Sequence, residues 1–236
     1  MTPVRHATLT AALCLLLCSG CAGVEGERDP RDPWEGLNRG VYRFNETVDE
    51  YVAQPLARAY VAVLHQEIRT RVSNFFANIQ DLLIGANNLL QGKFEDGITD
   101  WARFVFNSSF GLFGLHDFAS DAGLEKHNED FGQTLGRWGA GPGPYLVLPF
   151  LGSSTVRDAA GTAVDWAVQP VGEVRPIALR NSLYGLYFVD TRAQLLDASR
   201  ILEEAALDKY VFQRDAYLQR RRSLIYDGRP PREKIE

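Results

Sequence analysis

The feature that most constrains this chain is a short apolar run near its start that leads to a cysteine. Residues 7–18 (ATLTAALCLLLC) follow the basic residue Arg5 and precede a small-residue step that ends at Gly20 and Cys21. A basic start, an apolar run and a small-residue cleavage site are the three parts of a secretory signal peptide. The run is shorter than the roughly 20 apolar residues that span a bilayer. We therefore expect residues 1–20 to be a signal peptide that is removed.

A cysteine directly after the small residues is typical of a bacterial lipoprotein. Cleavage between Gly20 and Cys21 leaves Cys21 as the first residue, with S-diacylglycerol on its sulfur and an N-acyl group such as palmitate on its amine. Leu is usual three positions before that cysteine, where this chain has Cys18, so an ordinary signal peptide cleaved nearby is the alternative. Ala22 rather than Asp follows Cys21, which favours delivery to the outer membrane.

The cysteine count limits how the mature protein is stabilised. The chain has three cysteines, and removal of the signal peptide takes away Cys14 and Cys18. A redox site at the Cys18-x-x-Cys21 spacing would need a folded βαβ unit around it, which the signal segment does not supply. The mature chain is therefore expected to have no disulfide and no thiolate metal site, so packing alone must stabilise it. The formal net charge of −5 argues against a nucleic-acid partner.

The rest of the chain divides into three parts. Residues 21–31 form a lipidated N-terminus and a polar tether, residues 32–226 a single helical domain, and residues 227–236 a polar tail. The expected fold class is all-α, because apolar residues recur at helical spacing through most of the domain. The clearest stretches after the first helix are Leu56 to Leu64, Ile68 to Ile79, Asp81 to Leu90, Phe94 to Phe106, Ser154 to Val168 and Asp208 to Tyr226.

Local sequence predicts where several helices begin. Asp32 as N-cap with Pro33 at the first helical position predicts the first start, and Pro55 should kink or end that helix. Capping boxes predict further starts at Thr155 and Thr191, and the second of these helices should bury four residues, Leu195, Ala198, Leu202 and Ala205. The loop-rich section Gly132 to Gly152 leaves room for one brief strand, Tyr145 to Leu148, before Pro149 stops it.

No apolar run in the mature chain is long enough to span a bilayer as a helix. The amphipathic helices have two possible environments. They either pack on one another or lie face-on in a membrane, and helical periodicity does not decide between the two.

The chain offers little that suggests catalysis. It has no H-E-x-x-H zinc motif and no G-x-S-x-G nucleophile elbow. His116 and Asp121 stand at the spacing of a glycerolipid acyltransferase motif, which is two fixed residues in a chain rich in Asp. Residues 125–130 (EKHNED) gather possible metal ligands around a lysine and are interpreted as a polar loop. We therefore expect no enzyme, no metal and no cofactor besides the lipid on Cys21.

Several long stretches resemble the MlaA/VacJ family of outer-membrane lipoproteins. They are DPWEGLNRGVYRFNETVD (32–49), RVSNFFANI (71–79), NNLLQGKFEDG (87–97), DFGQTLGRWGAGPGPYLVLPFLG (130–152), STVRD (154–158) and RAQLLD (192–197). The resemblance implies a ring-like helical body embedded in the periplasmic leaflet of a Gram-negative outer membrane, with an amphipathic channel through it. It also implies a trimeric porin as partner, and removal of mislocalised phospholipid from the outer leaflet. A soluble periplasmic carrier would receive that phospholipid and feed an inner-membrane ABC transporter, with no bond made or broken.

A phospholipid channel needs polar groups beside apolar surface, because stranding either part of the lipid in the wrong medium costs several kcal/mol. Asn87 and Asn88, inside an apolar stretch, are candidate lining residues, with capping or packing as the alternative. Phe75 and Phe76 are candidates for the membrane boundary or for the core. The proline-stiffened loop 139–152 is a candidate lip or gate, through Gly141, Pro142, Gly143, Pro144 and Tyr145.

Overall fold

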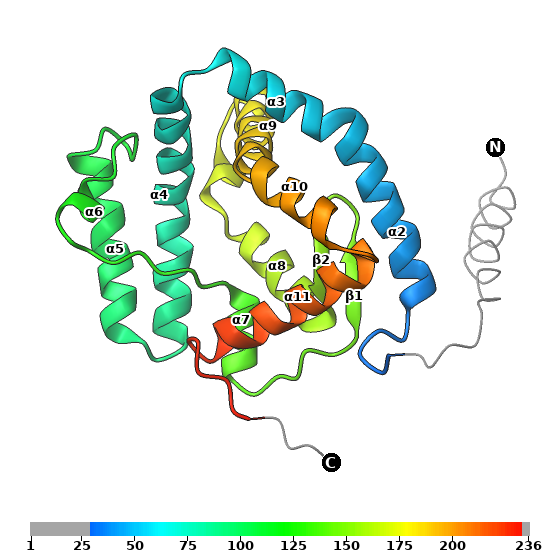
Figure 1. Cartoon of the computed structure of the whole chain (residues 1–236). Coiled ribbons are helices and arrows are strands. Elements are labelled where there is room, and N and C mark those ends of the chain that lie inside the picture. Colours follow the sequence, from blue (N-terminus) through cyan, green and yellow to red (C-terminus); the bar gives the residue numbers. More distant parts are fainter. Residues whose placement is uncertain (1–28, 233–236) are drawn as a thin grey trace, which may run out of the picture.

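The computed structural model describes residues 29–232, the side chains of residues 201–205 excepted. The predicted signal peptide, the lipid attachment at Cys21 and most of the tether lie outside the described residues. Helices form a ring in which α2 (Glu35–Val48) lies on the right, α3 (Gln54–Val63) at the top and α4 (Gln66–Leu90) on the left in the view of Figure 1. Near its base the ring continues through α7 (Phe131–Arg137) and α11 (Lys209–Ile225) (Figure 1).

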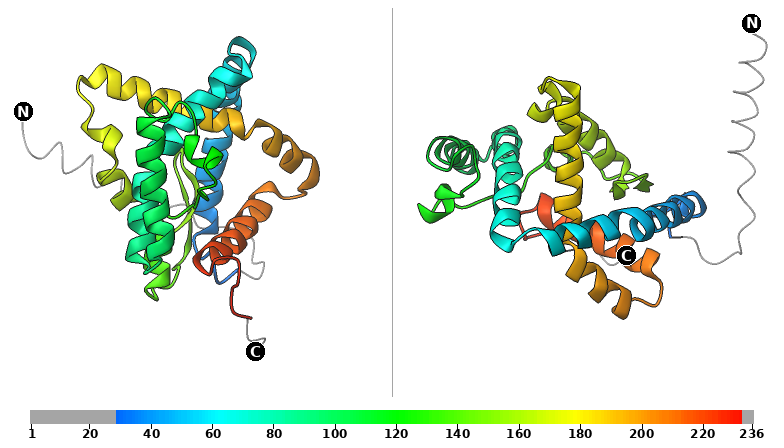
Figure 2. Two further views of the ribbon diagram at one scale, coloured as in Figure 1. Left: turned by 90° about the vertical axis from the view of Figure 1, so that its left-hand side faces the viewer. Right: turned by 90° about the horizontal axis from the view of Figure 1, so that it is seen from above.

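The remaining helices lie outside the ring or cross it. A pair of helices, α5 (Phe94–Ser109) and α6 (Phe118–Asp121), is on the outer side of α4 (Figure 1). Helix α9 (Ile177–Gln194) crosses the ring, with the segment that holds α8 (Val156–Ala167) and the 3-10 turn η2 (Pro170–Glu173) on one side. Helix α10 (Leu196–Ala205) projects on the other side (Figure 2).

The first helix begins later than its sequence suggests. The prediction that Asp32 caps it is wrong, because α2 starts at Glu35 and the Asp32 side chain is buried. That carboxylate instead accepts hydrogen bonds from Asn38 Nδ2 at 2.8 Å and Tyr210 Oη at 2.5 Å. The interruption expected before Pro55 is a π-helical turn, η1 (Asp49–Ala53), which leads directly into α3. Proline is tolerated in the first turn of α3 because its missing N–H has no intrahelical partner there.

One short hairpin breaks the helical pattern. Strand β1 (Tyr145–Leu148) has the predicted bounds and pairs antiparallel with β2 (Gly152–Thr155). The predicted start at Thr155 is confirmed, because its side chain accepts a hydrogen bond from the backbone N–H of Asp158 at the beginning of α8. A small core of Tyr145, Val147 and Tyr210 joins the hairpin to α11.

The C-terminal third differs most from the sequence-based prediction. The start predicted at Thr191 is wrong, because α9 continues through that residue to Gln194. Asp190, one residue earlier, is buried and accepts hydrogen bonds from Tyr60 of α3 and Ser73 of α4. These tertiary contacts keep the segment helical. Of the four residues expected to be buried, Leu195 and Ala198 are exposed, and the side chains of Leu202 and Ala205 are outside the described part. The helix start at Asp208 is confirmed.

None of the helices described for residues 29–232 is long and apolar enough to cross a membrane.

Candidate functional site

The polarity of this body is reversed relative to an ordinary water-soluble domain. Among the described residues, seventeen buried side chains are polar or charged and only ten are apolar. Soluble proteins usually bury apolar residues and rarely bury Asp or Arg fully. Many large apolar side chains are exposed instead, on several helices. Single exposed apolar residues are normal, whereas contiguous apolar faces indicate a contact surface.

Helix α5 shows the reversal most clearly. Its outward side carries the exposed residues Phe94, Ile98, Trp101 and Val105. Its inward side buries Gly97, Asp100, Arg103 and Asn107. Both sets follow the helical repeat. In water the apolar stripe of a helix faces the protein core, so α5 has the orientation expected of a helix with an apolar medium outside.

The inward side of α5 is held by a buried ionic cluster around Arg103, whose side chain is 1% exposed. Its guanidinium donates two hydrogen bonds to Asp117, at 2.9 and 3.0 Å, and lies 3.6 Å from Asp81 of α4. Lys126 forms a second ion pair with Asp81. Burial raises the pKa of Asp81 above its ordinary value, against the opposing charges of Lys126 and Arg103. The cluster fixes α4, α5 and α6 together through polar contacts.

Asp117 is the best-stabilised carboxylate of this cluster. Burial disfavours its charged form, but hydrogen bonds from Ser120 and Asn107 and the charge of Arg103 hold its pKa at about 2. The Asn107 amide also accepts a hydrogen bond from the Ala119 backbone N–H at 2.8 Å. Hydrogen bonds among these side chains therefore join the end of α5 to α6.

The predicted channel residues Asn87 and Asn88 lie at helix junctions. Asn88 donates to Asp100 of α5 at 2.8 Å. Asn87 accepts from the Thr134 hydroxyl of α7 at 2.8 Å and donates to Asp165 of α8 at 3.4 Å. These contacts favour the packing alternative. A role for the pair in lining a channel stays a prediction.

A second ionic cluster closes the ring where α7, α8 and α11 meet. Asp130 caps α7 and receives two hydrogen bonds from Arg221 of α11, each of 2.5 Å. Burial opposes ionisation of Asp130, but this guanidinium holds its pKa below the usual range. Arg221 also lies 3.1 Å from Asp158 of α8. Close approach of α7 and α8 depends on glycine, because a Cβ on Gly161 would lie 2.3 Å from the backbone N of Gly132.

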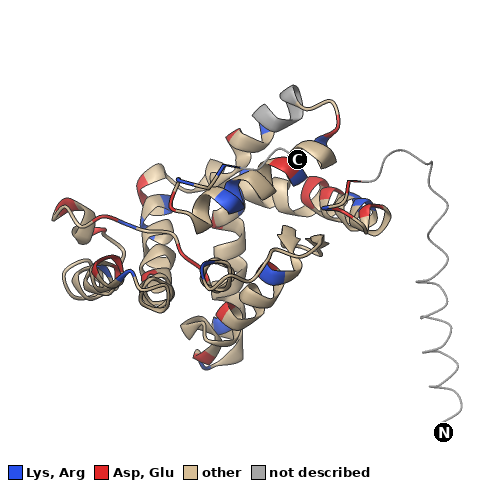
Figure 3. Cartoon of the chain, turned by 90° about the horizontal axis from the view of Figure 1, so that it is seen from below, with Lys and Arg blue, Asp and Glu red and all other residues tan. Residues whose placement is uncertain are grey.

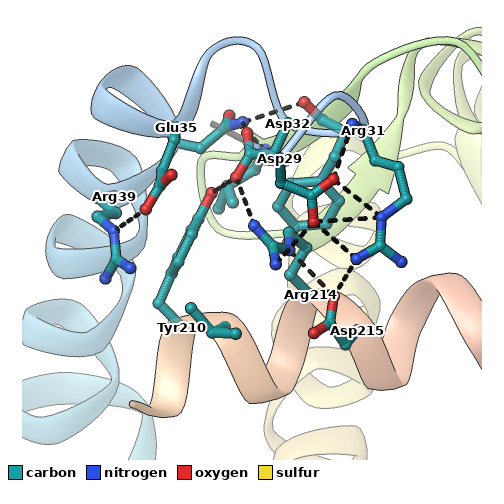
Figure 4. Close-up of polar contacts among 12 residues, drawn as sticks. Asp29, Arg31, Asp32, Glu35, Arg39, Tyr210, Arg214 and Asp215 are labelled. Carbon is teal, nitrogen blue, oxygen red and sulfur yellow. Dashed lines mark hydrogen bonds and ion pairs between the residues drawn. The ribbon is translucent and has the colours of Figure 1, made fainter. Parts of the chain in front are cut away.

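A third cluster fastens the start of the described chain to α11 (Figure 4). Arg31 pairs with Asp29 at 2.6 Å and with Asp215 at 3.0 Å, and Arg214 reaches Asp29 at 3.0 Å. The hydrogen bonds from Arg31 hold the pKa of Asp29 at about 2. The predicted tether therefore enters the folded body at a fixed point beside α11. Basic and acidic residues gather near the C-terminal end of the described chain, while long stretches of helix elsewhere carry neither (Figure 3).

The proline-stiffened segment at 139–152 includes strand β1 and the hairpin turn, so it is not a loop throughout, and its first part covers the start of α8. The carbonyls of Pro142 and Pro144 accept hydrogen bonds from the backbone N–H groups of Arg157 and Val156, at 3.2 and 3.1 Å. Gly141 and Gly143 are exposed. Tyr145 is buried and contacts the Ser153 hydroxyl at 2.8 Å. The hairpin tip exposes Phe150 and Leu151. The predicted role as a lip or gate stays a prediction.

The two predicted boundary phenylalanines lie on α4 at different depths. Phe76 is buried, with its ring centroid 5.0 Å from that of Tyr187 in α9, whereas Phe75 is half-buried. This placement favours the core alternative for Phe76. Other apolar side chains are more exposed, and they belong to η1 and α3 (Tyr51, Val52, Leu56, Val63) and to the α8–α9 segment (Trp166, Val168, Ile177, Leu179).

The only suggestion of catalysis in the sequence, His116 with Asp121, is a close pair. His116 Nε2 lies 2.8 Å from Asp121 Oδ2, and both side chains are exposed on the loop that holds α6. Within the described residues, no group of three or more His, Cys, Asp or Glu side chains is arranged to hold a metal ion.

Sequence reasoning missed the inverted helix α5 as a functional surface. The apolar residues of its outward side were recognised from their helical spacing. The polar residues Asp100, Arg103 and Asn107, which follow the same spacing on the opposite side, are the ones that identify a polar face. Two complementary stripes on one helix show that one face must meet an apolar medium and the other a polar one. The sequence alone did not say which face is outside.

The family model described as MlaA lipoprotein matches residues 30–224. A protein of Escherichia coli strain K12, named "Intermembrane phospholipid transport system lipoprotein MlaA", is 37% identical over 214 residues, which is 89% of this chain and 84% of that protein. A Haemophilus influenzae protein of the same name is 33% identical over 232 residues, covering 94% of this chain and 91% of its own length.

A solved structure has the same fold. It superposes with a TM-score of 0.73 at 33% sequence identity and covers 84% of this chain and 100% of its own. It belongs to a study described as "Structural basis for maintenance of bacterial outer membrane lipid asymmetry". The similarity therefore extends over most of this chain.

Proposed function

We propose, because this chain belongs to the MlaA lipoprotein family, that it is the lipoprotein of an intermembrane phospholipid transport system. In that role it maintains the lipid asymmetry of the outer membrane. The single observation that carries the proposal is the reversed polarity of the body, with charged clusters inside and apolar helix faces outside. A body of this kind is stable where acyl chains cover its outer faces.

The reversed polarity also supports a location within one leaflet. The described helices do not include a membrane-spanning one, and amphipathic helices lie along the interface with their apolar faces among acyl chains. The body would occupy the periplasmic leaflet of the outer membrane, fastened by the lipid on Cys21. Arg31 and Arg214 support this arrangement, because they fix the end of the tether to α11.

Transport would proceed from the outer leaflet toward the cell interior. A phospholipid mislocalised in the outer leaflet would enter the ring, with its head group against polar side chains and its tails against apolar surface. Asn87, Asn88 and the loop at 139–152 remain the candidate lining and lip. A soluble periplasmic carrier would then receive the lipid and deliver it to an inner-membrane ABC transporter. A trimeric porin would hold the ring in place, and no covalent bond would change.

The function is tested by deleting the gene and measuring phospholipid exposed on the cell surface. We expect a rise in surface phospholipid that the wild-type gene reverses. An unchanged amount of surface phospholipid in the deletion strain would contradict the proposal. The anchor is tested separately with Cys21→Ala, which should reduce the fraction of the protein found in the outer membrane.

A further inference from the structure

The turn between α5 and α6 has a backbone that its residues do not favour. Leu112 and Phe113 have φ values of 52° and 61°, in the left-handed region. Glycine and, less often, Asn or Asp occupy this region, because the Cβ of other L-residues clashes there. Both side chains are also strongly exposed, Leu112 at 68% and Phe113 at 76%. Strained non-glycine residues persist only where the surrounding structure fixes them, and they cluster at functional positions.

The surrounding structure does fix this turn. The Asn107 carbonyl accepts a hydrogen bond from the Gly114 N–H at 2.9 Å, and the Gly111 carbonyl accepts one from the His116 N–H at 3.0 Å. A Cβ on Gly111 would lie 2.1 Å from the His116 carbonyl, and a Cβ on Gly114 would lie 2.5 Å from the Asn78 side chain. The two glycines therefore let the turn sit directly on the polar base formed by Asn78 and Asn107.

The turn displays a continuous apolar surface. Phe110 is 64% exposed and its ring lies 5.8 Å from that of Phe106 and 6.3 Å from that of Phe118, measured between centroids. The sequence from 104 to 115 contains no charged residue. The surface continues along α5 through the exposed side chains of Val105 and Trp101. In water this arrangement is unfavourable twice over, because the backbone is strained and the apolar side chains are hydrated.

We propose that the turn formed by residues 110–115, the apolar turn, is a rigid anchor that inserts among phospholipid acyl chains. It holds the side of the body formed by α4 and α5 in the bilayer. This inference rests on the proposed function, which places the outward face of α5 against lipid, and it extends that contact to the turn. The occupant is lipid because the turn continues the α5 face and presents only apolar side chains outward.

The test uses the full chain, processed and lipidated, in vesicles of phosphatidylethanolamine and phosphatidylglycerol. Because lipid would block Cys21, a cysteine introduced elsewhere would be the one reactive thiol, and the parent protein without it should not label. Phe113→Cys and Leu112→Cys each carry an environment-sensitive fluorophore into the apolar turn. Ile98→Cys reports on the outward face of α5, and Glu125→Cys is the water-exposed control. Each labelled protein must unfold at the temperature of the parent.

We expect the fluorophores at 112 and 113 to be quenched by spin-labelled lipid and to lose quenching by iodide, as at 98, while iodide quenches the one at 125. Quenching by lipid at 98 but by iodide at 112 and 113 would overturn the inference and leave the proposed function intact. Quenching by iodide at all four positions would overturn both. Shielding from lipid and iodide together at 112 and 113 would mean that a protein covers the turn, which also overturns the inference.

Discussion

Arg103→Met tests whether buried charge, rather than an apolar core, holds the inverted body together. The methionine keeps a long side chain at a site that is 1% exposed but removes the guanidinium. It removes both hydrogen bonds to Asp117 and the bond of 2.5 Å to the Leu124 carbonyl. It also leaves Asp81 with Lys126 as its remaining cation among the described residues. The variant therefore leaves the charge of the buried Asp81 and of the half-buried Asp117 undercompensated, which costs more than the loss of one contact.

The magnitude follows from the cost of an unpaired buried charge. Removing one partner of a buried ion pair destabilises a protein by about 3–5 kcal/mol. For a domain of this size each kcal/mol lowers Tm by roughly 2–4 °C, so we expect a loss of about 6–20 °C. Arg58→Met is the matched control, because Arg58 is exposed on α3 and such surface changes stay within about 0.5 kcal/mol.

Thermal unfolding in detergent micelles, followed by tryptophan fluorescence, measures the difference. Adding Asp117→Asn to Arg103→Met should recover part of the lost stability, because the second change removes one of the uncompensated charges. The reasoning is refuted if Arg103→Met unfolds at the same temperature as Arg58→Met. It is also refuted if the double variant loses more stability than the sum of the losses in Arg103→Met and Asp117→Asn.

Gly161→Ala should destabilise the protein by about 1–3 kcal/mol, because its Cβ would overpack against Gly132. Gly185→Ala is the control, because Gly185 has open space around it in α9, and it should stabilise the protein by about 0.5–1 kcal/mol. Both effects are measured as shifts in Tm. The pKa of Asp117 falls from 3.8 to about 2 on folding. Its carboxylate therefore contributes stability above pH 4, and this contribution is lost as the pH falls toward 2. The Tm of Asp117→Asn should depend less on pH in that window than the Tm of the wild type. His116→Ala should leave phospholipid transport unchanged in complemented cells, because its pair with a carboxylate is exposed, and a loss of transport would favour the acyltransferase alternative.

Local sequence patterns predicted those elements whose ends are fixed by neighbouring residues. Thr155 caps α8 through the N–H three residues later, and Asp208 caps α11 in the same local way. The same residue types failed as predictors where distant partners compete for them. Asp32 is bound by Tyr210, far along the chain, and Thr191 follows an aspartate held by two other helices. Such contacts do not exist until the ring has formed, so no local pattern contains them.

The apolar outward face of α5 was partly predictable from the sequence. Periodicity gave the apolar stripe of α5, but its direction depends on the medium around the protein, which a pattern of residues does not specify. The buried cluster was not visible, because Arg103 of α5 meets Asp81 of α4 and Asp117 of the next loop only after α4 and α5 pack. The strained apolar turn was equally hidden, since a string of Phe, Leu and Gly does not reveal positive φ values at Leu112 and Phe113.

Removal of phospholipid by this lipoprotein can be measured as the rate at which phospholipid leaves the outer leaflet of living cells. A labelled phospholipid is placed in the outer leaflet, and its loss is followed in cells that carry the wild-type gene, lack it, or carry Arg103→Met. We expect rapid loss with the wild-type gene and slow loss in the deletion strain and with Arg103→Met. Equal rates of loss with and without the gene would contradict the claim that this lipoprotein removes phospholipid from the outer leaflet.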